Sequence, residues 1–428
     1  MTTVKIDKLV FQGQGLGRIE GSGKVAFAWN ALPGETVTLQ ATKNKKSFVD
    51  GVAIEIENPS PHRIAPVEDH YLSCSPWQIL DWAEENRQKV AVARETYQSI
   101  GGLAFDELEI AHSPDPQLHY RNKMEFSFTW SQDEKDELSL GFFNRGGRGF
   151  KPLPAGCTLA EPGINETALA VVDWLRRIDF FVPRTKSLIV RSNGAGQTIA
   201  ALFIKDEVAF ESYPELPSDC LGFQIYQSDP RSPASLPTKL LYSVGADSLT
   251  ATLNGISLKF GLLSFFQVNI GLFEQALDDI RPWLDPEQEV VDYYSGVGAI
   301  GLALHRHFKK AVLVDNNPQA IDYARENIAA AGVANCDAVL SEAEKITELI
   351  AHDKFLILDP PRAGLHQDVT AKILAEQPAR IIYLSCNLST HARDIALLRE
   401  YYDIDFMRLY NFFPRTPHIE ALCVLTRR

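Results

Sequence analysis

The sequence predicts a doubly wound α/β sheet in its C-terminal part, preceded by a small β-barrel and a mixed α+β middle domain. Three observations lead to this fold class. Short strand-like stretches fill residues 4–58, mixed strands and turns follow from about 105 to 240, and apolar runs alternate with helical stretches after about residue 265. A chain of 428 residues has room for two to four domains of about 100–200 residues each.

The first element is the barrel. Residues 25–29 alternate between the two faces of a strand, and glycine turns and the Pro33-Gly34 pair end strands at short intervals. Small barrels of this kind often bind oligonucleotides through their strand faces and loops. Basic residues that could contact phosphate are Arg18, Lys24, Lys43, Lys45 and Lys46. A solvated lysine run explains these residues equally well.

A helix and a mixed domain follow the barrel. After Pro76, apolar residues recur at helical spacing until Gly101-Gly102 ends the run: Val90, Ala93, Tyr97 and Ile100. Residues 105–248 then form the middle domain.

A hairpin is expected around Asn254-Gly255, because this dipeptide suits a tight turn that needs two positive φ angles.

The C-terminal part contains four apolar runs separated by helical stretches: residues 290–291, 311–314, 355–358 and 381–384. Runs of this kind are typical of parallel strands that are buried on both faces. Ligands of such sheets bind at the carboxyl ends of the strands. The residues that follow each run are therefore the candidates for chemistry.

The first two strand ends predict a cofactor site. Tyr294 and the glycines Gly296 and Gly298 follow the first run, where glycines permit a tight turn against a nucleotide-like ligand. Asp315 ends the next run, about 20 residues on, where a carboxylate can accept bonds from ribose hydroxyls. No third glycine shapes a pyrophosphate site, so the pattern suits S-adenosyl-L-methionine better than a dinucleotide.

The later strand ends supply reactive groups. Asp359 precedes two prolines, which give the strand a stiff exit and direct the carboxylate into the cleft. Cys386 lies at the end of the fourth run, where a thiolate could face the ligand. Glu420 opens the last strand, and a carboxylate there is costly unless it is used or paired. The alternative is that Asp359 is a solvated acid that only marks the end of a strand, and that Cys386 only packs in the core.

Composition limits the remaining possibilities. The net charge of −13 opposes long-range attraction of nucleic acid, so RNA binding must depend on local basic patches. Six cysteines lie far apart without C-x-x-C pairing, which argues against a disulfide framework and a local zinc site. With no membrane span and no export signal in view, we expect a soluble, cytoplasmic protein with no obligate protein partner.

These segments together resemble the uracil-C5 RNA methyltransferase family, over nearly the whole chain. The barrel is similar to a TRAM domain, and Tyr120-Arg121-Asn122 is similar to a middle-domain motif of the family. Four further motifs occur in the family's order: Ser264-Phe265-Phe266-Gln267-Val268-Asn269, the D-x-Y-x-G-x-G turn from Asp292 to Gly298, Asp359-Pro360-Pro361-Arg362, and Tyr383-Leu384-Ser385-Cys386-Asn387.

The resemblance implies a Rossmann-like class I methyltransferase that uses S-adenosyl-L-methionine. Cys386 would be the nucleophile and Glu420 the base, with Asp359 in the catalytic site. Gln267, Tyr294 and Asp315, with Asp359, would contact the cofactor or its surroundings. The partner would be structured RNA with a flipped-out uridine, held by the barrel and the middle domain. RNA contacts are expected from Arg18, Lys24, Lys45, Lys46, Arg121 and Lys123.

One departure from the family concerns metal. Members often carry a four-cysteine iron–sulfur site between the barrel and the helix, whereas residues 66–78 keep only Cys74. One thiolate cannot hold a cluster that needs about four, so we expect no iron–sulfur cluster and no metal ligand. The expected divisions are a TRAM-like barrel, a degenerate loop with the helix, the middle domain and the methyltransferase domain: residues 1–58, 59–104, 105–248 and 249–428.

Three functions are compatible with the sequence. The first is methylation of uridine C5 in 23S ribosomal RNA, with the T-loop uridine of tRNA as the alternative target. The second is an RNA-binding assembly factor without catalysis, which the presence of both Cys386 and Glu420 argues against. The third is a small-molecule methyltransferase, which leaves the barrel without a role.

Overall fold

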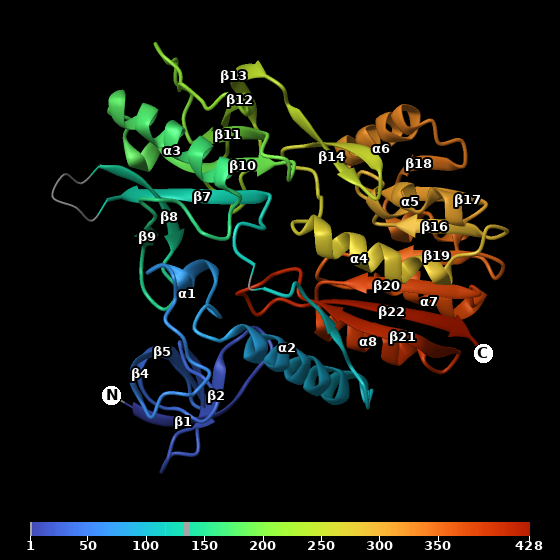
Figure 1. The fold of residues 1–428 in the computed structure, drawn as a ribbon, viewed down its shortest axis with the longest axis horizontal. Coiled ribbons are helices and arrows are strands. Elements are labelled where there is room, and N and C mark those ends of the chain that lie inside the picture. The colour runs from blue at the N-terminus through green and yellow to red at the C-terminus, as the bar shows by residue number, and fades with distance from the viewer. Residues whose placement is uncertain (1, 116, 132–136) are drawn as a thin grey trace. The chain divides into compact units, whose positions relative to one another are not determined.

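The structure, a computed structural model, describes residues 2–115, 117–131 and 137–428 (Figure 1). The chain forms two compact units, each built from separate stretches. Unit 1 comprises Met1–Gln88, Asp115–Leu249 and Pro414–Pro417, and unit 2 comprises Lys89–Pro114, Thr250–Phe413 and His418–Arg428. Residues 89–114, which the sequence divided between the helix and the middle domain, thus cluster with the C-terminal sheet.

The N-terminal strands of unit 1 close into a barrel, as the sequence predicted. The strand order is β1-β2-β3-β5-β4, and antiparallel pairing of β1 with β4 closes it. The strands are β1 (Thr2–Leu9), β2 (Gly15–Arg18), β3 (Val25–Trp29), β4 (Thr36–Asn44) and β5 (Phe48–Glu57).

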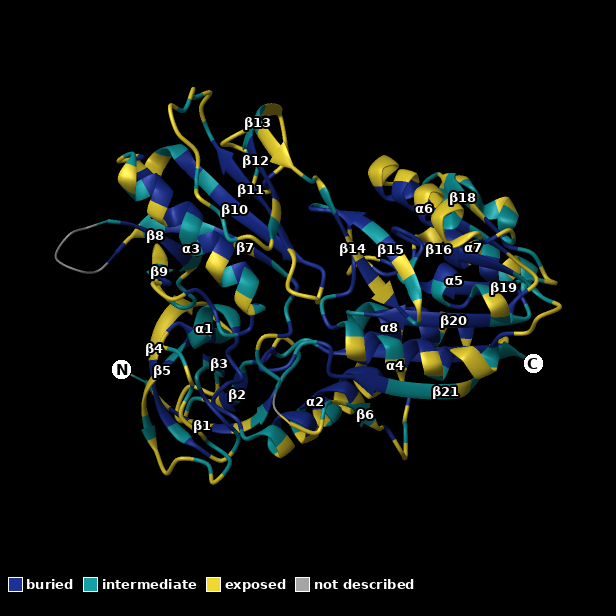
Figure 2. Cartoon of the chain, turned by 45° about the horizontal axis from the view of Figure 1, so that its top comes forward, coloured by how far each residue is buried: buried dark blue, intermediate teal, exposed yellow. Residues whose placement is uncertain are grey.

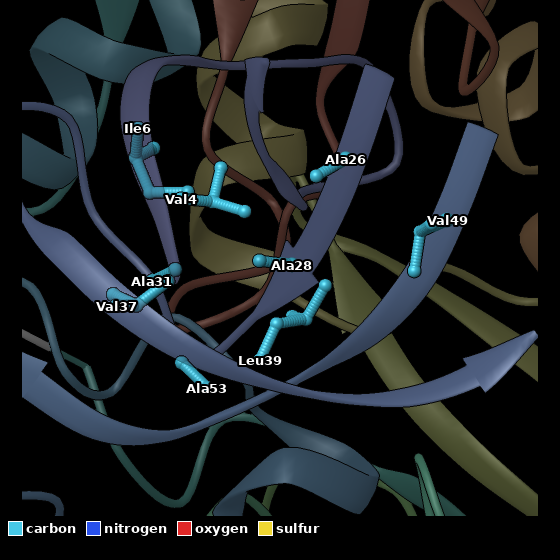
Figure 3. Packing of buried hydrophobic residues seen from close by; sticks show 9 residues of the cluster. All are labelled: Val4, Ile6, Ala26, Ala28, Ala31, Val37, Leu39, Val49 and Ala53. Carbon is cyan, nitrogen blue, oxygen red and sulfur yellow. The ribbon is translucent and has the colours of Figure 1, made fainter. Parts of the chain in front are cut away.

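Small side chains fill the barrel (Figure 3). Alternate residues of β3, Ala26 and Ala28, are fully buried, and Leu39 of β4 packs into the same interior. Because inward and outward positions alternate along a strand, the intervening residues of β3 lie nearer the surface. Because Ala26 and Ala28 are already fully buried among these residues, a larger side chain at either position would crowd the interior.

The middle part of unit 1 is a seven-stranded sheet with the order β13-β12-β11-β10-β7-β8-β9, packed by helix α3. This is the mixed α+β domain that the sequence predicted. The elements are α1 (Tyr71–Cys74), β7 (Lys123–Trp130), β8 (Leu138–Phe143), β9 (Phe150–Pro152), α3 (Pro162–Arg177), β10 (Thr185–Ser192), β11 (Thr198–Ile204), β12 (Cys220–Gln227) and β13 (Lys239–Gly245).

A short C-terminal segment, Pro414–Pro417, belongs to unit 1. The amide of Arg415 donates to the carboxylate of Glu85 (2.9 Å), and its guanidinium lies 3.3 Å from the same group, with both side chains buried. The carbonyl of Arg415 accepts from the amide of Trp77 (3.1 Å). The hydroxyl of Tyr120 donates to the carbonyl of Pro414 (3.1 Å).

Helix α2 (Trp82–Thr96) confirms the predicted amphipathic helix and continues as one π-helical turn, Tyr97–Gly101. The carboxylate of Asp81 accepts a bond from a first-turn amide (2.8 Å), and Gly102 ends the helix with a φ of 60°. The wider π turn changes the direction of the last residues. Ile100 is therefore exposed, although the helical spacing placed it on the buried face.

Unit 2 contains an eight-stranded sheet with the order β18-β17-β16-β19-β20-β22-β21-β6 (Figure 1). The four predicted runs form its central parallel strands, and β22 is antiparallel to β20. The strands are β6 (Ile110–Ala111), β16 (Glu289–Tyr293), β17 (Lys310–Asp315), β18 (Cys336–Leu340), β19 (Phe355–Leu358), β20 (Arg380–Ser385), β21 (Tyr402–Tyr410) and β22 (Glu420–Arg427).

The strand order reverses at β16, because the chain moves from β16 toward β18 and later from β19 toward β20. Right-handed crossovers then place the two sets of helices on opposite faces of the sheet, which explains why the central strands are buried (Figure 2). The helices are α4 (Ile270–Ile280), α5 (Ala299–Ala303), α6 (Pro318–Ala331), α7 (Gln367–Glu376) and α8 (Leu388–Leu398).

Short 3₁₀ turns occur in both units. They span Val182–Arg184 in unit 1 and Arg281–Trp283, His305–His307, Ala343–Lys345 and Thr347–Leu349 in unit 2.

The predicted hairpin is formed by β14 (Ser248–Leu253) and β15 (Ile256–Gly261). Asn254 and Gly255 have φ angles of 47° and 78°, as this turn requires. None of the helices in the described parts of the chain is long and apolar enough to cross a membrane.

The tight barrel interior leads to a stability prediction. Ala28→Leu should lower the free energy of unfolding of the full chain by about 1–3 kcal/mol, because extra methylenes in a packed core force side chains from their preferred rotamers. The control is Ala41→Leu, at an exposed position of β4, which should change it by less than about 0.5 kcal/mol. Urea unfolding of the two variants measures the difference, and equal effects would contradict the packing described above.

Candidate active site

The reversal of strand order places a tight turn at the carboxyl end of β16. Tyr294, Gly296 and Gly298 all have positive φ angles, of 65°, 56° and 87°. A side chain on Gly298 would also come within 3.0 Å of Leu302. The turn therefore requires glycine for both conformation and space.

Two carboxylates hold this turn in place. Asp315, at the end of β17, accepts bonds from the amides of Gly296 (2.9 Å) and Asn317 (2.8 Å). Asp292, within β16, accepts from the amide of Gly301 (3.1 Å) at the start of α5. Burial raises the pKa of Asp292 to about 8. Asp315 thus lies beside the glycine turn, where the sequence placed a cofactor contact.

The turn offers features that fit the expected S-adenosyl-L-methionine. The hydroxyl of Ser295 is buried and has no hydrogen-bond partner among the described residues, and the space beside Gly296 is open to 3.8 Å. A small cavity of about 20 Å³ lies between this turn, Gln267 and Asp359. A larger cleft of about 750 Å³ shares Tyr294 with it, and its size is typical of ligand sites.

The larger cleft, however, does not touch the reactive groups. Its walls come from the loop after Pro361, from α7 and from α8, including His366 and Arg393. Cys386, Asp359 and Glu420 are not among its lining residues. The three groups that the sequence predicted to be reactive therefore lie at the strand ends, outside the walls of this cleft.

Asp359 follows β19 and faces Gln267, whose side-chain amide donates to its carboxylate at 3.4 Å. Burial raises the pKa of Asp359 to about 7. This carboxylate therefore changes charge near neutral pH, which suits a group that exchanges protons.

Cys386 follows β20 directly and lies next to Asn387, whose side chain caps α8 by accepting from the amide of Ser389 (3.1 Å). The thiol is half-buried. Burial, together with the charges of Glu420 and Asp359, raises the pKa of Cys386 to about 11, against the lowering effect of Arg362. The thiol is consequently protonated at neutral pH unless a nearby group accepts its proton.

Glu420 begins β22, which pairs with β20 so that Ala421 lies opposite Ser385. Cys386 and Glu420 are the next residues beyond this last pair, one after β20 and the other at the start of β22. Glu420 is 2% exposed, and its Oε1 atom has no hydrogen-bond partner among the described residues. Burial first, and then the charge of Asp359, raise the pKa of Glu420 well above its usual range.

Arg362 is a site residue that the sequence reasoning quoted within a motif but gave no role. Its positive charge lowers the pKa of both Cys386 and Glu420. Its carbonyl accepts from the side chains of Asn387 (2.7 Å) and Thr390 (3.3 Å). The Asp359-Pro360-Pro361-Arg362 motif is the sequence signal that could have identified Arg362, because it places this residue three positions after Asp359.

A second network supports the start of α8. Asp394 accepts from the hydroxyl of Tyr383 (2.8 Å) and from the amide of Leu365 (3.0 Å). His391 shares a hydrogen bond of 2.7 Å with the hydroxyl of Tyr97, and burial lowers the pKa of His391 to about 3. This neutral histidine and the buried carboxylate hold the helix that follows Cys386.

The predicted RNA contacts differ in exposure. Lys45 and Lys46 are exposed at the end of β4, and Arg18 is exposed on β2. Lys24 is half-buried and donates to the side chain of Asn44 (3.0 Å). The middle-domain pair, Arg121 and Lys123, is also half-buried; burial lowers the pKa of Lys123 to about 8.

Comparison with known proteins places these features in a family. Residues 255–428 match the model of the tRNA (uracil-5-)-methyltransferase family, and residues 2–54 match the TRAM domain. An uncharacterized RNA methyltransferase of Porphyromonas gingivalis is 28% identical, with 99% of each chain covered. One of Lactiplantibacillus plantarum is 29% identical, covering 99% of this chain and 96% of the other.

Among solved structures, the fold is similar to that of the Pyrococcus abyssi tRNA (uracil-54, C5)-methyltransferase in complex with S-adenosyl-L-homocysteine. The TM-score is 0.75 at 22% identity, and all of both chains is covered. The fold class predicted from the sequence is thereby confirmed. With its N-terminal TRAM domain and its C-terminal catalytic domain, the chain belongs to the uracil-C5 RNA methyltransferases, which depend on S-adenosyl-L-methionine.

Proposed function

We propose that this enzyme methylates C5 of a uridine in 23S ribosomal RNA in the cytoplasm, with Cys386 as nucleophile and Glu420 as base. The observation that carries the proposal is the convergence of Cys386, Glu420 and Asp359 at one edge of the sheet. Asp359 and Cys386 follow the carboxyl ends of β19 and β20, and Glu420 begins the antiparallel strand β22. A thiol and two carboxylates with raised pKa values at this edge suit nucleophilic and acid–base catalysis.

The residue types follow from the chemistry of uracil. C5 is a poor nucleophile, and attack of the Cys386 thiolate on C6 produces an enolate whose C5 can accept a methyl group. When bound, S-adenosyl-L-methionine supplies that methyl group from its sulfonium. Glu420 then removes the C5 proton, the C5–C6 double bond forms again, and the thiolate leaves from C6.

The raised pKa values indicate which groups carry a proton before the reaction begins. Cys386 must lose its proton before it attacks, and Asp359, with a pKa of about 7, is a carboxylate of suitable basicity nearby. Arg362 favours the thiolate and the ionised form of Glu420. In this proposal Asp359 accepts the thiol proton, and Glu420 acts only after methyl transfer.

RNA binding would combine both domains of unit 1. Arg18, Lys45 and Lys46 of the barrel are exposed and suit phosphate contacts, which are strong even when the net charge of the protein is negative. Lys24, Arg121 and Lys123 are half-buried and suit contacts with an RNA segment that inserts more deeply.

A tRNA uridine is the second candidate substrate. The specific observation in its favour is that the Pyrococcus abyssi enzyme, which is named for tRNA uracil 54, matches the fold of this chain over its full length, TRAM domain included. A barrel of this type is therefore compatible with a tRNA substrate.

The two substrates can be distinguished in cells. Deleting the gene should remove 5-methyluridine from 23S ribosomal RNA and leave tRNA unchanged, as measured by mass spectrometry of nuclease digests of the separated RNAs. Re-expression of the wild type should restore the nucleoside, and Cys386→Ala should not. Loss of 5-methyluridine from tRNA alone would show that tRNA, and not 23S ribosomal RNA, is the substrate. No loss of 5-methyluridine from either RNA would contradict uridine methylation.

The two catalytic roles can be separated by trapping. Cys386→Ala should form no covalent adduct with RNA, whereas Glu420→Gln should attack and methylate the base but retain the C5 proton. Methylated RNA should then accumulate attached to Glu420→Gln, in a cofactor-dependent manner, while turnover falls by about 10²–10⁴-fold.

Denaturing gels with labelled RNA reveal this adduct as a slowly migrating band. The matched control is Cys220→Ala, which removes a half-buried thiol of the middle domain and should turn over normally. An adduct in Cys386→Ala would show that another residue is the nucleophile, and normal turnover of Glu420→Gln would show that another residue is the base.

The pH dependence of thiol reactivity tests the electrostatics of the site. Because the raised pKa of Cys386, about 11, keeps the thiol protonated at neutral pH, the thiolate fraction should rise about tenfold per pH unit from pH 7 to 10. Alkylation by iodoacetamide, followed at Cys386 by peptide mass spectrometry, measures this fraction.

Removing the charge of Arg362 should raise the pKa of Cys386 further, so Arg362→Gln should react more slowly at each pH. Arg325→Gln, which removes an exposed charge from α6, serves as control and should match the wild type. A plateau of the wild-type rate below pH 8 would contradict the protonated thiol.

A further inference from the structure

Four metal-binding side chains meet in unit 1, outside the active site. Glu68, His70 and Cys74 come from the segment between the barrel and α2, and Cys157 comes from the loop between β9 and α3. One ligand atom from each lies within 4.8 Å of the others. The sequence spacing left Cys74 as a single thiol, because Cys157 is distant along the chain.

The distances within this four-residue cluster suit one metal ion. Glu68 Oε1 lies 3.4 Å from the sulfur of Cys74 and 3.8 Å from that of Cys157, and Glu68 Oε2 lies 3.1 Å from Nε2 of His70. A tetrahedral zinc ion with bonds of about 2.0–2.3 Å separates its ligand atoms by roughly 3.3–3.8 Å. The side chains are thus already spaced as ligands of a single ion.

An unpartnered buried atom points independently to a ligand. His70 is 6% exposed, and its Nε2 atom has no hydrogen-bond partner among the described residues. Its approach to Glu68 is close but lacks hydrogen-bond geometry. A buried imidazole nitrogen without a partner costs free energy, and a metal ion in the cluster would satisfy it.

Neighbouring groups orient the candidate ligands. The side-chain amide of Gln78 donates to Glu68 Oε1 (3.0 Å), and the amide of Thr158 donates to Glu68 Oε2 (2.9 Å). Nδ1 of His70 lies 3.7 Å from the carboxylate of Asp69. Contacts of this kind fix ligand orientation around protein metals.

The iron–sulfur cluster found in many family members does not fit these residues. A four-iron cluster requires about four thiolates, and the candidate site contains two. Two thiolates with one imidazole and one carboxylate are instead donors that zinc accepts in tetrahedral sites.

We propose that Glu68, His70, Cys74 and Cys157 bind one Zn²⁺ ion. The ion is structural, because all four positions of a tetrahedral shell are occupied by protein. It links the segment that follows the barrel to the middle domain and replaces the earlier expectation of no metal ligand. The proposal is independent of the target of methylation.

The test is the metal content of the full-length protein. Protein purified under reducing conditions without chelators should contain about one zinc per chain by plasma mass spectrometry, and iron and acid-labile sulfide should be well below stoichiometric. His70→Ala and Cys157→Ser should lose most of the zinc. The matched controls His62→Ala and Cys220→Ser, which change a histidine and a cysteine of unit 1 outside the cluster, should keep it.

Cobalt provides a readout that does not depend on activity. After exchange of the metal for Co²⁺, the wild type should show thiolate-to-cobalt charge-transfer absorption and the visible bands of a tetrahedral ion, and both should be absent from Cys157→Ser. Circular dichroism checks that the variants are folded. Three results for the wild-type protein would each overturn the proposal. They are the absence of zinc, a disulfide between Cys74 and Cys157 that persists under reducing conditions, and stoichiometric iron and sulfide.

Discussion

The proposed active site depends on one strand pairing, that of β22 against β20. Its antiparallel register sets Ala421 opposite Ser385. Glu420, which begins β22, and Cys386, which follows β20, therefore lie at the same edge of the sheet. A slip of one residue would turn Glu420 to the other face of the sheet. The fully buried side chains along both strands make such a slip costly, so core packing also fixes the geometry of the proposed site.

The same burial determines the charge state of the site. Carboxylates and a thiol removed from water favour their neutral forms. Here the charges of Glu420 and Asp359 also raise the pKa of Cys386, and the charge of Asp359 raises the pKa of Glu420. Arg362 opposes this trend from an exposed loop that stiff prolines hold in place. Burial and positive charge thus act in opposite directions on the pKa values of Cys386 and Glu420.

Local signals predicted much of the fold. The Asn254-Gly255 turn, the glycine-punctuated barrel and the apolar runs of the parallel sheet each follow from short-range chemistry, and the structure confirms them. The strand ends also located Asp359 and Cys386. Sequence could not predict that the two-residue strand β6 joins the C-terminal sheet, or that Cys157 approaches Cys74, because these contacts link distant residues and leave no local pattern.

The segment Pro414–Pro417 has a consequence for how the protein is made. It belongs to unit 1, whose other residues end at Leu249, and it lies near the last residue of the chain. The buried ion pair of Arg415 with Glu85 can form only after the chain has been synthesised through Arg415. Unit 1 is thus completed only after the residues of unit 2 up to Phe413 have been made. Removing Pro414–Pro417 should take a buried cation away from Glu85, in a domain that begins hundreds of residues earlier.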